Sequence, residues 1–264
     1  MSVFQAVVLG ILQGLTEFLP VSSSGHLVLG QRLLGIDEPG VTFEVVLHLA
    51  TLTAVLWVYR RRVGELLAGI FTGKAEAWRY AGLIVLASIP AGLAGVFLRG
   101  AFEGAFDRPL LAASMLLVTG CIVYTLKYTG PRADRPLPDA RRGLWIGVAQ
   151  AAAILPGISR SGSTVAMGAW LDVEVVRMAE FSFLMSVPAI LGAGLLEADG
   201  FGATAAHGMA PIVAGFVTAA LAGVLAIRLF VRMLQARTFH HFAWYCWAAG
   251  GAYLLAALAW PALR

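Results

Sequence analysis

Residues 10–26 read GILQGLTEFLPVSSSGH, and residues 147–163 read GVAQAAAILPGISRSGS. Each stretch has a glycine three residues before a glutamine, then Leu-Pro, then a serine-rich turn that contains a late glycine. Each lies in a region of two apolar runs of about 10–15 residues, which are too short to cross a bilayer. Because proline breaks a helix, each region predicts a helical hairpin that enters the membrane and returns to the same side.

The composition of the whole chain is that of a membrane protein. Of its 264 residues 59% are hydrophobic and only 13% are charged, with a mean hydropathy of +0.81. A soluble domain of this length could not keep so much apolar area out of water. The two cysteines, Cys121 and Cys246, sit in separate apolar runs and predict neither a disulfide nor a metal site.

Long apolar segments separate and follow the two hairpins. Each has the roughly 20 residues that a spanning helix requires. The predicted order is hairpin, three spans, hairpin, three spans. The six predicted spans are 41–59, 78–98, 109–128, 178–198, 210–231 and 243–262.

This order predicts an all-α integral membrane protein built as an inverted repeat. Three spans is an odd number, so the second copy must be inverted relative to the first, and broken helices of both copies then meet near the midplane. We expect one polytopic domain over 1–264. It comprises repeat one (about 1–128), a cytoplasmic linker (129–142) and repeat two (about 143–264).

The distribution of basic residues predicts the orientation. Cytoplasmic loops carry the excess of lysine and arginine. The opposite side receives only Arg32, Arg99, Arg108 and Arg264, and Arg160 lies inside the second hairpin. Both termini and the mouth of the first hairpin should therefore face outward, with the second hairpin entering from the cytoplasm. The same excess explains the net charge of +4 without a nucleic-acid partner. The cytoplasmic set is Arg60, Arg61, Arg62, Lys74, Arg79, Lys127, Arg132, Arg135, Arg141, Arg142, Arg177, Arg228, Arg232 and Arg237.

An acidic side chain in the first hairpin needs an explanation, because an ionisable group in the bilayer is costly unless it is paired or hydrated. Glu17 follows Gln13 by four residues, so both side chains share one helix face. The pair could bind a cation, or Glu17 could act as a general base. The structural alternative is a carboxylate that caps the serine turn.

The serine turn of the first hairpin has the residues of an anion site. Ser22, Ser23, Ser24 and Gly25 precede a helix predicted to start near His26, and a helix N-terminus favours anions. Simple N-capping by serine is the alternative. His26 could be a nucleophile, a general acid or base, or a structural histidine. We interpret His48, alone on an apolar segment, as structural.

The second turn places Arg160 in a similar setting. Its planar guanidinium suits a pair of phosphate oxygens, and a structural ion pair with Glu17 is the alternative. Glu44, at the start of the first span, is either interfacial or a partner of Arg160 or of a cation. Together the two turns predict an anion-binding site, with phosphate or a phosphorylated lipid as the ligand. The accompanying residues of the second turn are Gly157, Ser159, Ser161, Gly162, Ser163 and Thr164.

Three motifs in this order resemble those of the undecaprenyl-diphosphate phosphatase family, also called the bacitracin-resistance family. The family carries [E/Q]-x-x-x-E, then P-V-S-S-[ST]-G-H, then P-G-x-S-R-S-G in the second half. They correspond here to Gln13–Glu17, Pro20–His26 and Pro156–Gly162, and Phe43–Val46 also fits. The resemblance covers essentially the whole chain.

The resemblance implies hydrolysis of undecaprenyl diphosphate to the monophosphate and phosphate at the outer face of the bacterial inner membrane, which recycles the lipid carrier for cell-wall synthesis and confers bacitracin resistance. It also implies a divalent cation, Mg²⁺ or Ca²⁺, for which Gln13 and Glu17 are the candidate ligands. Glu17, His26 and Arg160 fall on the catalytic positions, and Ser22 and Ser23 lie in the active turn. Ser23 and His26 are both candidate nucleophiles.

A second function fits the same topology. Secondary transporters also combine inverted repeats with broken helices, so a flippase for lipid phosphates could use Arg160 as its anchor. The cluster of Glu17, the serines and His26 favours the enzyme, because a carrier has little use for it. A homodimer is a candidate assembly.

Overall fold

The computed structural model describes residues 1–36, 41–129, 135–196, 208–260 and 263. Within these ranges the chain is helical, without strands apart from one isolated β-bridge, as predicted. Residues 130–134 of the predicted linker and the ends of two predicted spans, 197–198 and 261–262, lie outside them, as do Arg132 and Arg264. The helices are α1 (Val3–Phe18), α2 (Ser23–Leu33), α3 (Val41–Val58), α4 (Arg60–Phe71), α5 (Ala75–Phe97), α6 (Arg99–Phe106), α7 (Pro109–Tyr124), α8 (Ala140–Ala152), α9 (Arg160–Trp170), α10 (Val175–Leu196), α12 (Met209–Gln235) and α13 (Phe242–Ala259).

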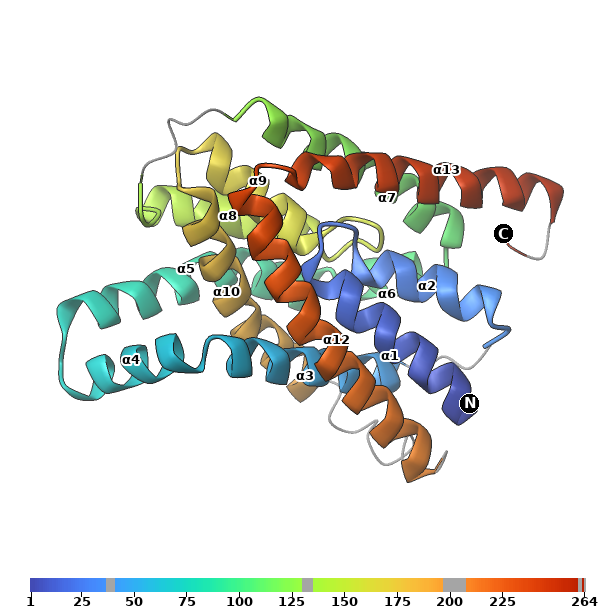
Figure 1. Cartoon of the computed structure of the whole chain (residues 1–264), viewed down its shortest axis with the longest axis horizontal. Coiled ribbons are helices and arrows are strands. Elements are labelled where there is room, and N and C mark those ends of the chain that lie inside the picture. Colours follow the sequence, from blue (N-terminus) through green and yellow to red (C-terminus); the bar gives the residue numbers. More distant parts are fainter. Residues whose placement is uncertain (37–40, 130–134, 197–207, 261–262, 264) are drawn as a thin grey trace.

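Two helical hairpins, α1–α2 and α8–α9, enter the molecule from opposite ends, and their turns meet in its middle (Figure 1). The helix after the first turn begins at Ser23, three residues before the predicted start. Its N-terminus is fixed by Ser22, whose side chain accepts a hydrogen bond from the backbone N–H of Gly25. Ser159 caps α9 in the same way through Gly162, so the two turns share their local design.

Each of the six predicted spans contains a helix within its described residues. Within the described residues five helical segments are each long and apolar enough to cross a membrane: α5, α10, α12, α7 with the 3₁₀ turn after it (Pro109–Lys127) and α13 with the 3₁₀ turn before it (Phe239–Ala259). The predicted span at 41–59 corresponds to α3, which continues into α4 after a bend of 79°. The helix α4, which the sequence analysis did not predict, begins with Arg60, Arg61 and Arg62. Guanidinium groups are costly in lipid, which explains why the chain turns at this point and packs α4 against α5.

The packing pairs each hairpin with a span of the other half. The helix α1 lies along α12, and α8 lies along α5. Small residues allow these close approaches. A side chain at Gly14 of α1 would put its Cβ 2.4 Å from the carbonyl oxygen of Ala219 in α12, and one at Gly147 of α8 would meet the Ala87 carbonyl at 2.3 Å. The hairpins are thus held by backbone-to-backbone packing.

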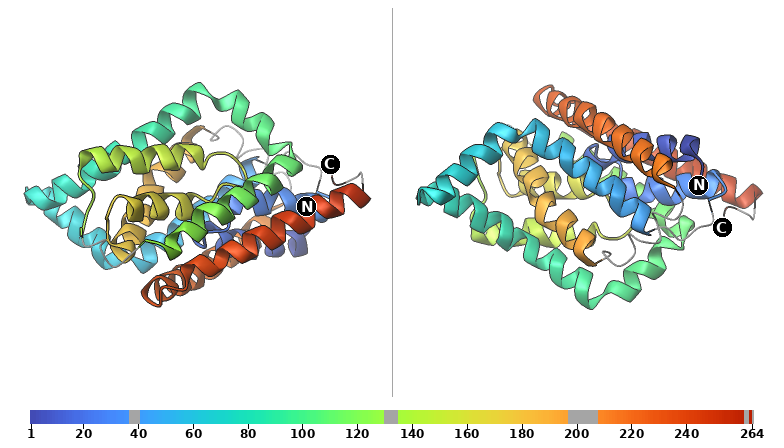
Figure 2. Two further views of the ribbon diagram at one scale, coloured as in Figure 1. Left: turned by 90° about the horizontal axis from the view of Figure 1, so that it is seen from above. Right: turned by 90° about the horizontal axis from the view of Figure 1, so that it is seen from below.

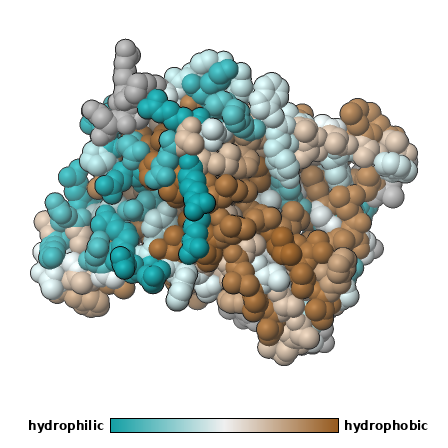
Figure 3. Space-filling view, in the orientation of Figure 1, coloured by the Kyte–Doolittle hydropathy of each residue, from teal (hydrophilic) through white to brown (hydrophobic). Residues whose placement is uncertain are grey.

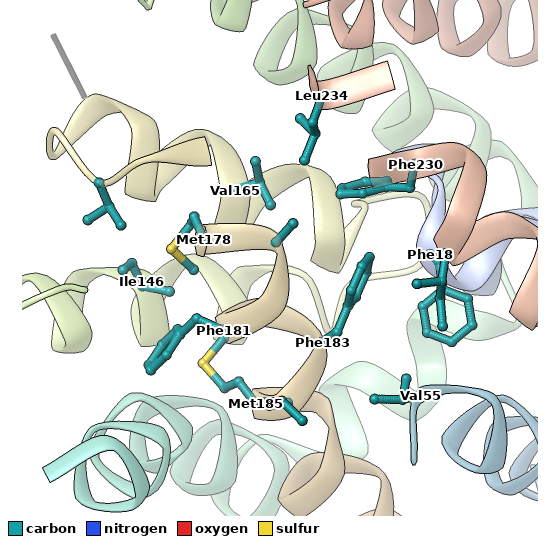
Figure 4. Packing of buried hydrophobic residues seen from close by; sticks show 14 of the residues in the cluster. Phe18, Val55, Ile146, Val165, Met178, Phe181, Phe183, Met185, Phe230 and Leu234 are labelled. Atoms are coloured by element: carbon teal, nitrogen blue, oxygen red, sulfur yellow. The ribbon is translucent and has the colours of Figure 1, made fainter. Parts of the chain in front are cut away.

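The largest cluster of buried hydrophobic residues gathers around α10 (Figure 4). Phe183 of α10 stacks edge-on against Phe18 of α1 and contacts Phe230 of α12. Phe181 and Met178 face Ile146 and Val165 of the second hairpin in the same cluster. Helix α10 therefore contacts both hairpins just outside their turns.

The outer surface is apolar where lipid is expected. Large hydrophobic residues such as Leu221 and Leu225 of α12 and Leu255 and Leu258 of α13 are exposed. Figure 3 shows such residues over the side formed by α1 and α12, with hydrophilic residues gathered at the opposite end. The start of α1 and the end of α13 lie at one end of the molecule, and the α4–α5 connection lies at the other (Figures 1 and 2).

Replacement of Gly14 by valine should destabilise the protein. The added side chain collides with the backbone of α12, and overpacking typically costs about 1–3 kcal/mol. Thermal unfolding of the purified protein in detergent should show a lower midpoint for Gly14→Val. Gly82→Val, on an exposed position of α5 where an added Cβ meets no atom within 4 Å, is the control and should unfold close to the wild type.

Candidate active site

A buried carboxylate lies where the two hairpin turns meet. The Glu17 side chain at the end of α1 is only 6% exposed. Its Oε1 accepts a hydrogen bond from Nη2 of Arg160 at 2.6 Å. Its Oε2 accepts one from Oγ of Ser23 at 2.6 Å and one from Nε2 of Gln13 at 3.1 Å. Groups from α1, α2 and α9 therefore converge on one acid.

Arg160 is the counter-charge from the opposite hairpin. It is the first residue of α9, and its side chain is 15% exposed. Besides Glu17 it donates to the backbone carbonyl of Ser182 in α10 at 3.2 Å. A guanidinium has five N–H donors, so these two bonds leave donors for a further acceptor. The ion pair that the sequence offered as an alternative is therefore present, and it is compatible with anion binding.

Ser23 is the first residue of α2 and occupies the position that Arg160 occupies in α9. It is partly exposed. Because Oγ donates its proton to Glu17, the oxygen lone pairs are free to face a ligand. A hydroxyl bonded to a carboxylate is the arrangement of an activated nucleophile. Both N-termini, the positive ends of α2 and α9, point to the same centre.

Direct contacts between the turns fix this geometry. The Ser22 Oγ accepts a hydrogen bond from the backbone N–H of Gly157 at 3.1 Å, and Ser161 Oγ donates to the Leu19 carbonyl at 3.2 Å. A Cβ on Gly25 would lie 2.8 Å from Cα of Gly157. Gly157 also has φ of +95°, a conformation that favours glycine. The two glycines of the turns are therefore required by the close approach.

The hydroxyls predicted to bind substrate in the second turn all have protein partners. Ser159 caps Gly162, Ser161 bonds to Leu19, and Thr164 donates to the Arg160 carbonyl at 2.8 Å. All of these side chains are buried. They brace Arg160, while Ser23 and Ser24 of the first turn are partly exposed. A direct role in substrate binding stays a prediction for this set, which comprises Ser22, Ser24, Gly25, Gly157, Ser159, Ser161, Gly162 and Thr164.

His26 forms its hydrogen bonds with two other elements of the site region. A catalytic role for its imidazole stays a prediction. Nδ1 lies 2.8 Å from the Ser22 carbonyl oxygen, and Nε2 lies 2.8 Å from the hydroxyl of Tyr245 in α13. Tyr245 was not singled out in the sequence, because nothing in its apolar surroundings links it to residues more than 200 positions away.

His48 is the histidine that faces Glu17. Its Nε2 lies 3.6 Å from Glu17 Oε2, and its Nδ1 lies 2.8 Å from the carbonyl oxygen of Glu44. The side chain is 29% exposed. We interpreted His48 as structural because it stands alone in its helix. Glu44 itself accepts a hydrogen bond from Gln31 at 3.0 Å, and no described contact joins it to Arg160.

The described residues do not form a ready-made site for Mg²⁺ or Ca²⁺ at Gln13 and Glu17. No group of three or more His, Cys, Asp or Glu side chains is close enough among them to hold a metal ion. Both oxygens of Glu17 accept hydrogen bonds from protein donors, and Gln13 turns its NH₂ group toward the acid. Dependence on a divalent cation stays a prediction.

The fold and the site together define a class: a polytopic α-helical membrane protein in which two opposed hairpins bring a carboxylate, a serine and an arginine together in the interior, a candidate site for an anionic ligand. A serine with a carboxylate partner, an arginine and two helix N-termini are the components of such a site. Comparison with known proteins then gives the family. Residues 6–252 match the model of the bacitracin resistance protein BacA, and the chain belongs to that family.

Curated relatives agree over nearly their full length. The chain is 42% identical to a protein of Desulfosudis oleivorans, with 95% of this chain and 97% of the relative aligned. It is 40% identical to one of Geobacter sulfurreducens (96% and 98%) and 37% identical to one of Methanobrevibacter smithii (95% and 96%). All three relatives carry the name undecaprenyl-diphosphatase. The resemblance deduced from the three motifs is therefore confirmed.

Replacement of Arg160 by alanine should destabilise the protein more than the double variant Glu17→Gln, Arg160→Ala. The single change leaves a buried carboxylate without its counter-charge, which costs about 3–5 kcal/mol, whereas the amide of glutamine removes that charge. Thermal unfolding in detergent measures both.

Arg62→Ala is the matched control, since Arg62 pairs with Glu180 but its side chain is 34% exposed. It should lower the unfolding midpoint less. A double variant less stable than Arg160→Ala alone would contradict this account of the pair.

Proposed function

We propose that the chain hydrolyses undecaprenyl diphosphate to undecaprenyl phosphate and phosphate. Membership of the BacA family and the name of its relatives support the reaction and its substrate. The observation that carries the proposal is the contact of Ser23 and Arg160 with the two oxygens of Glu17, at 2.6 Å each. It joins a nucleophile, a proton acceptor and an anion-binding group in one place.

The proposed reaction begins with the diphosphate against Arg160 and the N-termini of α2 and α9. The Ser23 Oγ attacks the terminal phosphorus while its proton passes to Glu17. The bond between that phosphorus and the bridging oxygen breaks, and undecaprenyl phosphate leaves. Water then attacks the phosphorus of the phosphoserine, Glu17 returns its proton to the Ser23 oxygen as that bond breaks, and phosphate leaves. Arg160 and the helix N-termini offset the charge on the phosphoryl oxygens throughout, which is the main requirement of this chemistry.

Ser23 is preferred to His26 as the nucleophile for a geometric reason. Both ring nitrogens of His26 are within 2.8 Å of protein partners, whereas the Ser23 hydroxyl is partly exposed and bonded to a base. The Ser23 lone pairs can therefore reach phosphorus without the loss of an existing contact.

The architecture and location complete the proposal. The chain is one domain made of an inverted repeat, supported by the reciprocal packing of α1 on α12 and of α8 on α5. It lies in the bacterial inner membrane with the first hairpin and both termini facing the periplasm. The support for this orientation is that most lysines and arginines fall in loops on the opposite side, and cytoplasmic loops carry the excess of basic residues. The product then appears on the face where lipid carriers release cell-wall precursors. A homodimer remains a candidate.

Purified protein in detergent should release phosphate from undecaprenyl diphosphate, and Ser23→Ala should reduce the turnover at least about a hundredfold, because the attacking atom is lost. A colorimetric phosphate assay measures this. Ser114→Ala is the matched control, since its hydroxyl bonds only within α7, and it should keep wild-type turnover. Transfer of lipid phosphate across liposomes without phosphate release would instead favour the flippase.

A single cysteine at position 141 should react with a membrane-impermeant maleimide only in inverted membrane vesicles, and one at position 108 only in right-side-out spheroplasts. Arg141 and Arg108 are exposed and lie on opposite sides in the proposed orientation. The background carries Cys121→Ser and Cys246→Ala. Labelling of position 141 from the outside would overturn the orientation.

A further inference from the structure

The imidazole of His26 is held at both nitrogen atoms. A carbonyl oxygen can only accept a hydrogen bond, so the Nδ1 that lies 2.8 Å from the Ser22 carbonyl must carry the proton. The Nε2 atom then accepts a bond from the hydroxyl of Tyr245 at 2.8 Å. The ring planes of the two residues are nearly parallel, 11° apart. His26 thus links α13 to the first turn.

The far end of this link is a strained residue. Ser22 has φ of 65° and ψ of 100°, a region that non-glycine residues enter at a cost of about 1–3 kcal/mol. Its carbonyl accepts both the backbone N–H of His26, at 3.2 Å, and the imidazole N–H. Because Ser23 follows directly, the orientation of the Ser22 peptide sets where the Ser23 hydroxyl points.

Helix α13 contacts the same turn a second time. The thiol of Cys246, next to Tyr245, lies 3.5 Å from the Pro20 carbonyl oxygen and is fully buried. Tyr245 itself is 47% exposed, so its ring is not fixed by close packing on all sides. The hydrogen bond to His26 is therefore the contact that directs its hydroxyl into the protein.

We propose that Tyr245 is a positioning residue for the phosphatase reaction: through His26 and the Ser22 carbonyl it holds the strained turn so that the Ser23 hydroxyl stays on Glu17. The inference rests on the proposed function, and it adds a residue of the last span to a site built by the two hairpins together with His48 of α3 and the Ser182 carbonyl of α10. It also gives His26 a role as a link rather than as the attacking group.

Tyr245→Phe should lower kcat for undecaprenyl diphosphate about five- to tenfold and leave KM nearly unchanged, because one neutral hydrogen bond is lost and the ring is kept. The same change should expose Nε2 of His26. Diethyl pyrocarbonate, which acylates free imidazole nitrogen, should then modify His26 several times faster than in the wild type, as measured by peptide mass spectrometry.

Two further variants test whether Tyr245 acts through His26. His26→Asn can keep an N–H near the Ser22 carbonyl but has no atom for Tyr245, so adding Tyr245→Phe to it should cause no further loss of kcat. Tyr253→Phe is the control on the same helix. Its hydroxyl bonds to the Leu263 carbonyl at 2.9 Å, and its loss should change neither kcat nor the labelling of His26.

The labelling test does not depend on turnover, so it separates this inference from the proposed function. A wild-type protein without phosphatase activity would refute the proposed function alone. Unchanged labelling of His26 in Tyr245→Phe would overturn the inference, and so would faster labelling with wild-type kcat. Full additivity of Tyr245→Phe and His26→Asn would also overturn it.

Discussion

The ion pair between Glu17 and Arg160 is the interaction on which the rest of the structure depends. It joins residues 143 positions apart, from hairpins that enter the molecule at opposite ends. Either charge alone would be costly so deep in the protein. The pair therefore joins the two hairpins at their turns, and each partner stabilises the charged form of the other in the interior. A site for a phosphate ligand can be built at this position because the arginine keeps unused donors.

The surrounding residues serve to keep that centre rigid. The hydroxyls of Ser22 and Ser159 cap helices, and the hydroxyl of Ser161 forms a hydrogen bond between the two turns. Glycines at the contact permit backbone atoms to approach to a distance that any side chain would prevent. Ser23, Ser24 and His48 beside this centre are partly exposed. Hydrogen bonds that fix the surrounding groups keep such a site preorganised, so that little rearrangement is needed when charge develops on a ligand.

The contact between the two hairpin turns also explains why the turns carry different chemical groups. Ser23 and Arg160 stand at equivalent first positions of α2 and α9, and both reach the same carboxylate. The first hairpin contributes the acid and the hydroxyl, and the second contributes the cation. Two hairpins of similar sequence thus build one asymmetric cluster, since corresponding positions that meet at one point need not carry the same residue.

The sequence by itself determined the fold class, the two hairpins and the apolar helices between and after them, and it singled out Glu17, Ser23 and Arg160, which the structure brings into contact. Hydropathy, proline breaks and ionisable residues in apolar runs are local signals with strong energetic costs. The sequence could not place His26 on Tyr245 or His48 beside Glu17. Those contacts depend on how α13 and α3 rotate against the first hairpin, and that rotation is set by the packing of whole helix surfaces. The tertiary structure alone decided which histidine faces the acid.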